Sequence, residues 1–116
     1  MELTGKCKED FEKWYEPPLP ADANGWDKAL YGDKVAEIYR LPKSMRYGVY
    51  VDFFDSVGIY IDLEIHAEPT MSGLIFKSIR PNILSNGRFY TVGASFRERP
   101  IARTEAIKKA NELYND

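Results

Sequence analysis

Residues that carry chemistry are scarce in this chain. Its 116 residues include one cysteine and one histidine, so neither an internal disulfide nor a site of several Cys and His ligands can form. No spacing typical of a nucleotide, metal or nucleophile motif occurs, and we expect neither a cofactor nor an enzymatic activity. No run approaches the ~20 apolar residues that cross a bilayer, and the first 20 residues are charged rather than apolar. These absences predict a soluble, cytoplasmic protein that does not enter a membrane.

Charge is present but unevenly distributed. Residues 1–68 hold 14 acidic and 8 basic side chains, a net charge of −6, whereas residues 69–116 hold 4 and 8, a net charge of +4. The formal total of −2 hides this asymmetry. Such a split bears on partners and on orientation in a complex rather than on fold.

Helical spacing appears at the start of the chain. After Thr4, a candidate N-cap, four apolar residues form the stripe of a short amphipathic helix: Cys7, Phe11, Trp14 and Tyr15. Prolines at positions 17 and 18 end this helix, and residues 16–34 are expected to form an irregular loop containing Pro and Gly. Between residues 26 and 41 the signals are weak and indicate one or two helical turns around residues 34–39.

Residues 44–57 have two interpretations. Four apolar residues recur every four positions: Met45, Val49, Phe53 and Val57. Ser44 as N-cap and Gly58 as C-cap favour a helix over this segment. In that helix we expect Phe53 to face the core and Phe54 to lie on the flank. The competing strand pattern is the alternation of Tyr47, Val49, Val51 and Phe53.

Three strands and a last helix follow. Apolar and polar residues alternate strictly over residues 58–66, which predicts a strand with one buried face and one exposed face. A second strand is predicted over residues 74–80, between Gly73 and Pro81. The Asn86-Gly87 turn then leads to a third strand that continues to Phe96. The final helix is predicted from its apolar stripe: Ala102, Ala106, Ile107, Ala110, Leu113 and Tyr114.

The predicted fold class is α+β. At 116 residues the chain has the usual length of one domain. We expect a single domain over residues 1–116, with N-terminal helices, a three-stranded antiparallel sheet and a C-terminal helix that covers the sheet.

Acidic side chains gather in the middle of the chain. The candidate partner-binding set is Asp52, Asp55, Tyr60, Asp62, Glu64 and Glu68. Carboxylates in such a group can dock on a basic protein surface, or can mimic phosphates toward a basic groove of a protein. Paired carboxylates also serve as general acid and base. An ordinary solvated strand face has the same composition.

A metal centre is a third interpretation of part of this set. Asp62, Glu64 and His66 project from one strand face, about 7 Å apart per step. Two carboxylates and an imidazole are ligands that iron or manganese accepts. Steps of that length are too wide to converge on one ion without further ligands, so no metal is expected.

Basic side chains gather near the end. The candidate nucleic-acid-binding set is Arg97, Arg99, Arg103, Lys108 and Lys109. Arginines at such spacing can contact phosphates. A soluble helix face also explains them, since Glu105 and Lys109 form an i, i+4 pair. Cys7 lies on an apolar stripe and is expected in the core rather than as a nucleophile.

Three segments resemble small proteins of unknown function encoded by bacteriophages and prophages. They are LTGKCKEDFEKW (residues 3–14), LPKSMRYGVYVDFFDSVG (41–58) and RTEAIKKANEL (103–113). The resemblance carries no catalytic motif and transfers no residue roles. It implies a phage setting, in which compact acidic proteins often inhibit host defence machinery, as anti-CRISPR proteins do.

The order helix, three strands, helix also resembles the double-stranded RNA-binding domain, whose last helix grips phosphates. Here that helix begins with Ala102-Arg103-Thr104-Glu105 in place of the family's lysine-rich motif. We therefore expect a non-enzymatic inhibitor that docks on a basic surface of a host defence protein. An RNA-binding module is the alternative.

Overall fold

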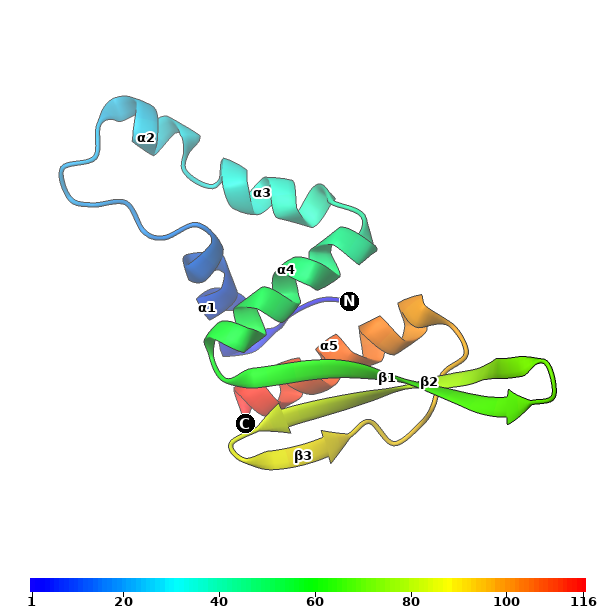
Figure 1. Ribbon diagram of the computed structural model, residues 1–116. Helices are drawn as coiled ribbons and strands as arrows, with labels where there is room; N and C mark the ends of the chain where they lie inside the picture. Colours follow the sequence, from blue (N-terminus) through cyan, green and yellow to red (C-terminus); the bar gives the residue numbers. More distant parts are fainter.

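Five helices and one sheet make up the fold (Figure 1). The computed structural model describes all residues, 1–116. Four helices come first: α1 (Gly5–Tyr15), α2 (Gly25–Leu30), α3 (Asp33–Arg40) and α4 (Lys43–Ser56). The antiparallel sheet follows, in the order β1 (Ile59–Thr70), β2 (Gly73–Ser85), β3 (Arg88–Thr91), and α5 (Arg99–Asn115) packs on it. The predicted α+β class and the covering C-terminal helix are confirmed.

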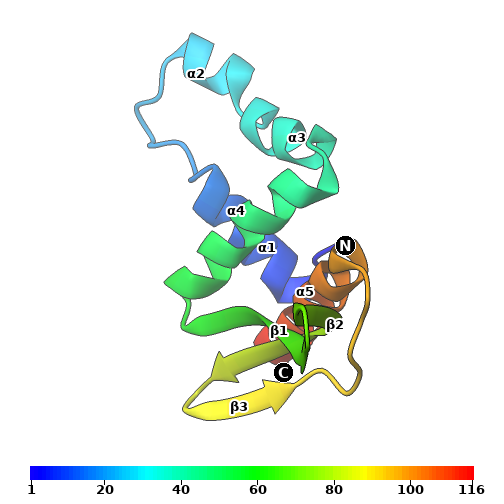
Figure 2. The same ribbon diagram turned by 45° about the vertical axis from the view of Figure 1, so that its right-hand side comes forward.

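The molecule is elongated. Its principal extents are 66 × 29 × 17 Å and its Cα radius of gyration is 17.7 Å, whereas a compact chain of this length has a radius near 13 Å. Two arms project from the centre (Figure 1). One holds α2 and its flanking loop, and the other is the distal half of the β1–β2 hairpin. The helices lie on one side of the sheet and leave its other face uncovered (Figure 2).

The core lies where α1, α4 and α5 meet the base of the sheet. Its buried cluster comprises Leu3, Cys7, Phe11, Ile38, Tyr50, Phe53, Phe54, Ile59, Ile83, Ile107 and Ala110. The Phe11 ring meets the edges of two α4 rings, with centroids 5.0 Å from Tyr50 and 5.5 Å from Phe53. Such T-shaped contacts add to the burial of apolar area, which stabilises the fold most.

The helix interpretation of residues 44–57 is confirmed, with a different inward face. Tyr50, Phe53 and Phe54 are fully buried, whereas the side chains of Met45 and Val57 are 56% and 41% exposed. The expectation that Phe54 lies on the flank is therefore wrong. Positions four apart on a helix advance by about 400°, so a strict four-residue repeat drifts about 40° per step and cannot keep one face inward.

Of the two capping predictions for α4, the one for the C-terminal end is confirmed and the one for the N-terminal end is wrong. Gly58 has φ +82° and ends the helix in the left-handed conformation, as expected. Ser44 is not the N-cap: the helix begins at Lys43, Pro42 precedes it, and no side chain caps it. Proline is suited to this boundary because it provides a fixed φ and lacks an N–H group.

The segment predicted as an irregular loop, residues 16–34, contains α2 and the start of α3, so that prediction is wrong in part. Asn24 Oδ1 accepts a hydrogen bond from the backbone N–H of Asp27 (2.8 Å) and caps α2. At the start of α3, the backbone N–H of Gly32 donates a hydrogen bond to the carboxylate of Glu16, at the other end of the loop (3.0 Å). This long-range cap leaves no local sequence pattern.

The second and third strands differ from their predicted bounds because of Pro81. β2 continues through Pro81 to Ser85 instead of stopping before it. The Pro81 carbonyl accepts a hydrogen bond from Val92 N–H (3.2 Å) on the β3 side. The N–H and C=O of one strand residue point to the same neighbour, so the N–H that proline lacks would also have faced β3. The ladder with β1 is therefore intact. Pro81 cannot return a second bond to Val92, and β3 ends at Thr91 instead of continuing to Phe96. Phe96 rejoins the sheet only through a bridge to Ile79.

A bulge divides the β1–β2 hairpin into two halves. Ile65 pairs with Ile79 and His66 with Ser78, but Ala67 pairs with Phe76, so Lys77 is an extra residue. The extra residue inverts the alternation in β2 and places Leu74 and Phe76 on the same face as Ile65. All three are exposed, because that face extends past the covering helices.

Two asparagines of α5, Asn111 and Asn115, hold the start of the chain. Thr4 is at the N-cap position of α1, as predicted, but its side chain makes no capping hydrogen bond there. The Thr4 hydroxyl instead accepts a hydrogen bond from Asn111 Nδ2 (2.9 Å). Asn111 Oδ1 in turn accepts from Thr4 N–H (2.9 Å). The first turn of α1 is capped from α5, since Cys7 N–H donates to Asn115 Oδ1 (2.9 Å).

Candidate protein-docking face

The uncovered face of the sheet presents side chains in rows across the strands. The first row is apolar and consists of Tyr60, Leu84 and Phe89. Tyr60 is 51% and Phe89 78% exposed. The second row is polar and consists of Asp62, Asn82 and Thr91. Aromatic side chains are enriched at protein interfaces relative to the rest of the surface.

The predicted acidic set lies in three places. Tyr60, Asp62 and Glu64 share the uncovered face, as expected from the strand alternation. The carboxylate of Asp62 makes no ion pair, while Glu64 Oε2 accepts from Asn82 Nδ2 (2.9 Å).

The other three acidic residues lie apart. Glu68 is in the distal hairpin and pairs with Lys77 (3.5 Å), so its charge is compensated. Asp52 and Asp55 are on the exposed side of α4 and make no ion pair. The structure thus does not bring the six residues together as one patch.

The polar end of the face is hollowed. A depression of about 340 Å³ is lined by Glu64, His66, Ser78, Arg80 and Ser95. It forms where residues 92–95 leave the sheet, a consequence of Pro81. Glu64 and Arg80 are directly opposite each other on β1 and β2, so the charges within the depression are mixed.

The metal hypothesis gains no geometric support. Asp62, Glu64 and His66 all point to the uncovered face. No group of three or more His, Cys, Asp or Glu side chains in the structure is placed to hold a metal ion. Regular strand spacing keeps these three apart, and no neighbouring strand supplies a further carboxylate or imidazole.

The predicted basic set is divided between two flanks of α5. Arg103 lies over the ring of Tyr47 on α4, with its guanidinium carbon 5.5 Å from the centroid. Lys109 lies on the β3 side, 5.8 Å from the Tyr90 centroid and 3.9 Å from Glu112. Burial raises the pKa of Tyr47, and the Arg103 charge opposes that rise. Because the two cations are about 120° apart around the helix axis, they form no single stripe.

The remaining basic residues do not restore a stripe. Arg97 and Arg99 are exposed before and at the start of α5, and Lys108 is exposed further along it. Lys108 and Lys109 border a shallow depression together with Glu105 and Glu112, so the surface there is of mixed charge.

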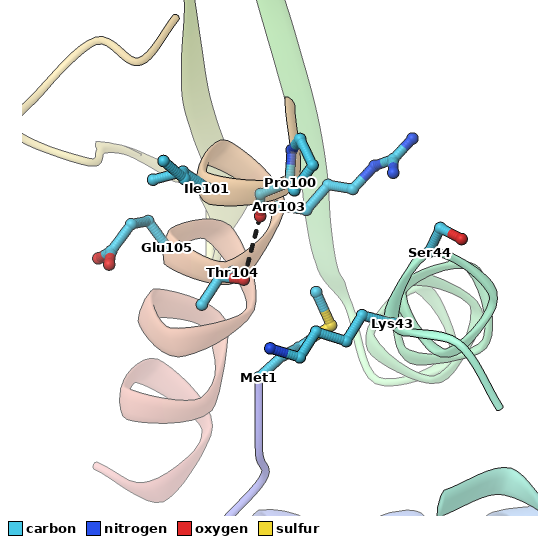
Figure 3. A pocket seen from close by; sticks show the side chains of 8 residues that line it. All are labelled: Met1, Lys43, Ser44, Pro100, Ile101, Arg103, Thr104 and Glu105. Atoms are coloured by element: carbon cyan, nitrogen blue, oxygen red, sulfur yellow. Dashed lines mark hydrogen bonds between the residues drawn. The ribbon is translucent and has the colours of Figure 1, made fainter. Parts of the chain in front are cut away.

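A hollow that the sequence did not indicate lies between the starts of α4 and α5 (Figure 3). Its volume is about 360 Å³, and it is lined by Met1, Lys43, Ser44, Pro100, Ile101, Arg103, Thr104 and Glu105. The Thr104 hydroxyl donates to the Pro100 carbonyl (3.0 Å) and is already satisfied. No short motif could reveal this hollow, because its two walls are separated by more than 50 residues.

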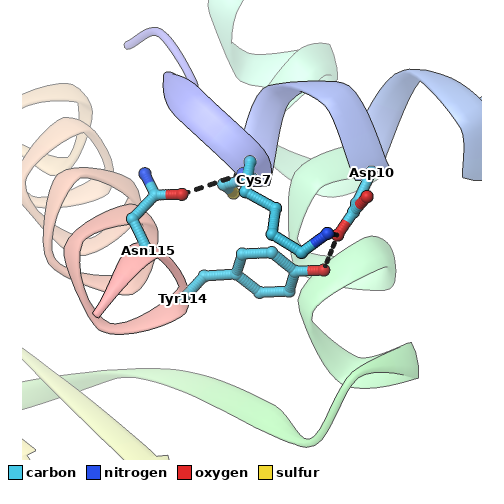
Figure 4. A network of polar contacts seen from close by, with 5 residues as sticks. Cys7, Asp10, Tyr114 and Asn115 are labelled. Carbon is cyan, nitrogen blue, oxygen red and sulfur yellow. Dashed lines mark hydrogen bonds and ion pairs between the residues drawn. The ribbon is translucent and has the colours of Figure 1, made fainter.

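Cys7 belongs to the core, as predicted. It is fully buried, and burial raises the pKa of its thiol to about 12, with a smaller contribution from Asp10. A thiol with so high a pKa is protonated at neutral pH and is a poor nucleophile. Beside it, the Tyr114 hydroxyl donates to Asp10 Oδ2 at 2.5 Å (Figure 4).

No helix in the structure has the length and apolar character to cross a membrane. No family model, curated protein or solved structure matches the chain.

Proposed function

We propose that the protein is a non-enzymatic, cytoplasmic interaction protein that docks on a basic surface of a protein partner through the uncovered face of its sheet. The observation that carries the proposal is the row of Tyr60, Leu84 and Phe89 next to the unpaired carboxylate of Asp62. Two large exposed aromatic rings on a rigid sheet supply contact area at low entropic cost. Asp62 supplies the charge that selects a basic partner.

The biological role that we propose comes from the phage resemblance. A small protein that covers a basic surface blocks whatever that surface binds, and a nucleic-acid groove of a host defence protein is the kind of target that fits. The protein then acts as an inhibitor by occupying the groove, in the manner of anti-CRISPR proteins. No catalytic residue is required for this mechanism.

The RNA-binding alternative has less support. The order α4, β1, β2, β3, α5 agrees with it. However, Arg103 and Lys109 lie about 120° apart around α5, and each lies over an aromatic ring. Binding to a phosphate backbone requires several cations on one surface. We therefore keep RNA binding as an outcome of the test rather than as a second proposal.

The test is quantitative capture from a lysate of the bacterial host, with two variants of equal charge change. The docking variant is Asp62→Lys with Glu64→Lys, and the control is Asp33→Lys with Glu37→Lys, two exposed positions of α3. We expect the docking variant to retain about tenfold less of the partner, and the control to behave as the parent. Exposed substitutions of this kind usually change stability by about 0.5 kcal/mol or less, so both variants should fold.

Two results would contradict the proposal. If both variants lose the partner equally, net charge rather than this face controls binding. If the parent retains RNA at near-physiological salt and Arg99→Glu with Arg103→Glu abolishes that retention, the protein is a nucleic-acid-binding module.

A further inference from the structure

A second candidate site is a cavity among the helices, formed by residues that precede the sheet in the sequence. Its volume is about 280 Å³, and six residues line it: Glu2, Leu3, Lys8, Tyr39, Arg46 and Tyr50. They come from the segment before α1 and from α1, α3 and α4. This volume is just below the roughly 300 Å³ at which pockets for drug-sized ligands begin, so the cavity has room only for a smaller molecule or ion.

Two hydrogen-bonding atoms of this cavity have no partner. The hydroxyl of Tyr50, whose side chain is fully buried, makes no hydrogen bond, and neither does the buried Nε of Arg46. These are the only buried side-chain polar atoms of the chain without a partner. Such groups are rare because leaving a buried donor unpaired costs free energy, so each requires an explanation.

The neighbouring tyrosine provides a comparison within the same cavity. Tyr39 Oη donates to Glu12 Oε1 at 2.8 Å and is thus satisfied. Burial raises the pKa of Tyr39, and the bond to Glu12 adds to that rise. The lack of a partner is therefore specific to Tyr50 and Arg46, which lie one helical turn apart on α4.

The charges at the cavity favour an anion. Lys8 and Arg46 contribute two positive charges and Glu2 one negative charge. Burial raises the pKa of Tyr50, and the charge of Arg46 together with a side-chain interaction between Arg46 and the Tyr50 hydroxyl opposes that rise. The two groups therefore lie close to each other, although neither Tyr50 Oη nor Arg46 Nε completes a hydrogen bond. The Tyr50 hydroxyl stays protonated at neutral pH. Three groups match the oxygens of a carboxylate or a phosphate: the Tyr50 hydroxyl, the cationic Arg46 with its unpaired Nε–H, and the Lys8 ammonium. Leu3 and the tyrosine rings supply an apolar wall.

We propose that this cavity binds a small organic anion, whose carboxylate or phosphate oxygens accept hydrogen bonds from Arg46 Nε–H and Tyr50 Oη–H. Lys8 compensates the remaining charge from α1. The bound anion joins the start of α1 to the middle of α4. This site is independent of the docking face and does not rest on the proposed function.

The direct test is an NMR titration of the full chain with inorganic phosphate, with succinate, and with sodium chloride at matched ionic strength. We expect saturable shifts of Arg46 Nε–H and of the amides of Leu3, Lys8 and Tyr50, beyond those that chloride produces. The stronger of phosphate and succinate identifies the oxyanion class. If neither exceeds chloride, the proposal is overturned.

Variants separate a site from a general effect of charge. Tyr50→Phe keeps the ring and removes the donor, and should weaken binding about tenfold, as expected for one hydrogen bond to an ionised acceptor. Arg46→Gln should weaken it by more than about tenfold, because it also removes the positive charge that faces the anion. Tyr39→Phe is the control and should stay within about twofold of the parent. Equal affinity in the parent and Tyr50→Phe would contradict the proposal, even if Arg46→Gln does not fold.

Stability without the anion provides a second readout. Tyr50→Phe should unfold at the same or a higher denaturant concentration than the parent, since its hydroxyl has no bond to lose. Tyr39→Phe should unfold at a lower concentration, because it loses the bond to Glu12. If Tyr50→Phe loses as much stability as Tyr39→Phe, the Tyr50 hydroxyl already has a partner and the site is not an anion site.

Discussion

Large apolar side chains occupy two kinds of region in this molecule. At the centre, Phe11, Tyr50, Phe53 and Phe54 are almost entirely enclosed by α1, α4, α5 and the sheet. In the two arms, residues of similar size are exposed: Trp26 and Leu30 in α2, and Met71, Leu74, Ile75 and Phe76 in the hairpin. Composition alone does not separate these groups. Burial in this molecule therefore depends on whether a helix covers the residue. The distal hairpin is exposed because α5 covers only its base.

The largest effect is expected in the centre. Phe53→Ala and Phe54→Ala should each lower the free energy of unfolding by about 3–5 kcal/mol, the usual cost of emptying a core phenylalanine site. Phe53 contacts four other rings, at centroid distances of 5.4 to 5.8 Å. Chemical denaturation measures both values. A loss below about 1 kcal/mol at either position would contradict the described core.

A smaller effect is expected where α5 holds the start of the chain. Asn111→Ala removes the two hydrogen bonds to Thr4 and leaves the Thr4 N–H without its acceptor. We expect a loss of about 1–3 kcal/mol. Thr4→Val, which removes only the hydroxyl, is the matched control and should cost less. Equal costs for the two variants would show that the backbone bond contributes nothing.

The hydrogen bond between Tyr114 and Asp10 predicts dependence on pH at both ends of the scale. The bond from Tyr114, supported by Lys6, lowers the pKa of Asp10, so this contribution to stability is present above the unfolded pKa of about 3.9 and is lost as the pH falls through the folded value. The same bond raises the pKa of Tyr114 to about 12. Its contribution is therefore present below about pH 10 and is lost between about pH 10 and 12.

Tyr114→Phe tests both halves of this expectation. The variant should raise the pKa of Asp10 toward its ordinary value of about 3.9, followed by carboxyl chemical shifts. The decline in stability between about pH 10 and 12 should become shallower. An unchanged Asp10 pKa would show that Lys6, 3.4 Å away, rather than Tyr114 controls the carboxylate.

The smallest effect is expected in the hairpin arm. Leu74→Ser and Met71→Ser should each change the free energy of unfolding by about 0.5 kcal/mol or less, because neither side chain packs on the core. Denaturation under the conditions used for the phenylalanine variants provides the comparison. A loss comparable with that of Phe53→Ala would mean that the hairpin is covered in solution.

The sequence predicted elements better than it predicted which residues they bury. The helix over residues 44–57 followed from Gly58 and from the spacing, yet Phe54 was placed wrongly because a four-residue repeat drifts around a helix. The Asn86-Gly87 turn is confirmed, with Asn86 at φ 53° and Gly87 at φ 75°. The ends of β2 and β3 were missed because the effect of Pro81 depends on which neighbouring strand its nitrogen faces.

The candidate sites show the same limit. Alternation in β1 correctly placed Tyr60, Asp62 and Glu64 on one exposed face, because that pattern is local. Phe89 and Leu84 join them only through strand pairing, and we did not predict their role. The cavity at Tyr50 and Arg46 depends on four segments meeting, so no local spacing could indicate it.

Native-state hydrogen exchange tests the contrast between centre and arms most directly. The account predicts that backbone amides of α4, α5 and the base of β1 and β2 exchange only through global unfolding. Amides of residues 67–76 and of α2 should exchange through local opening, orders of magnitude faster. Equal protection of the distal hairpin and the centre would contradict the account, because the arms would then be part of the cooperative core.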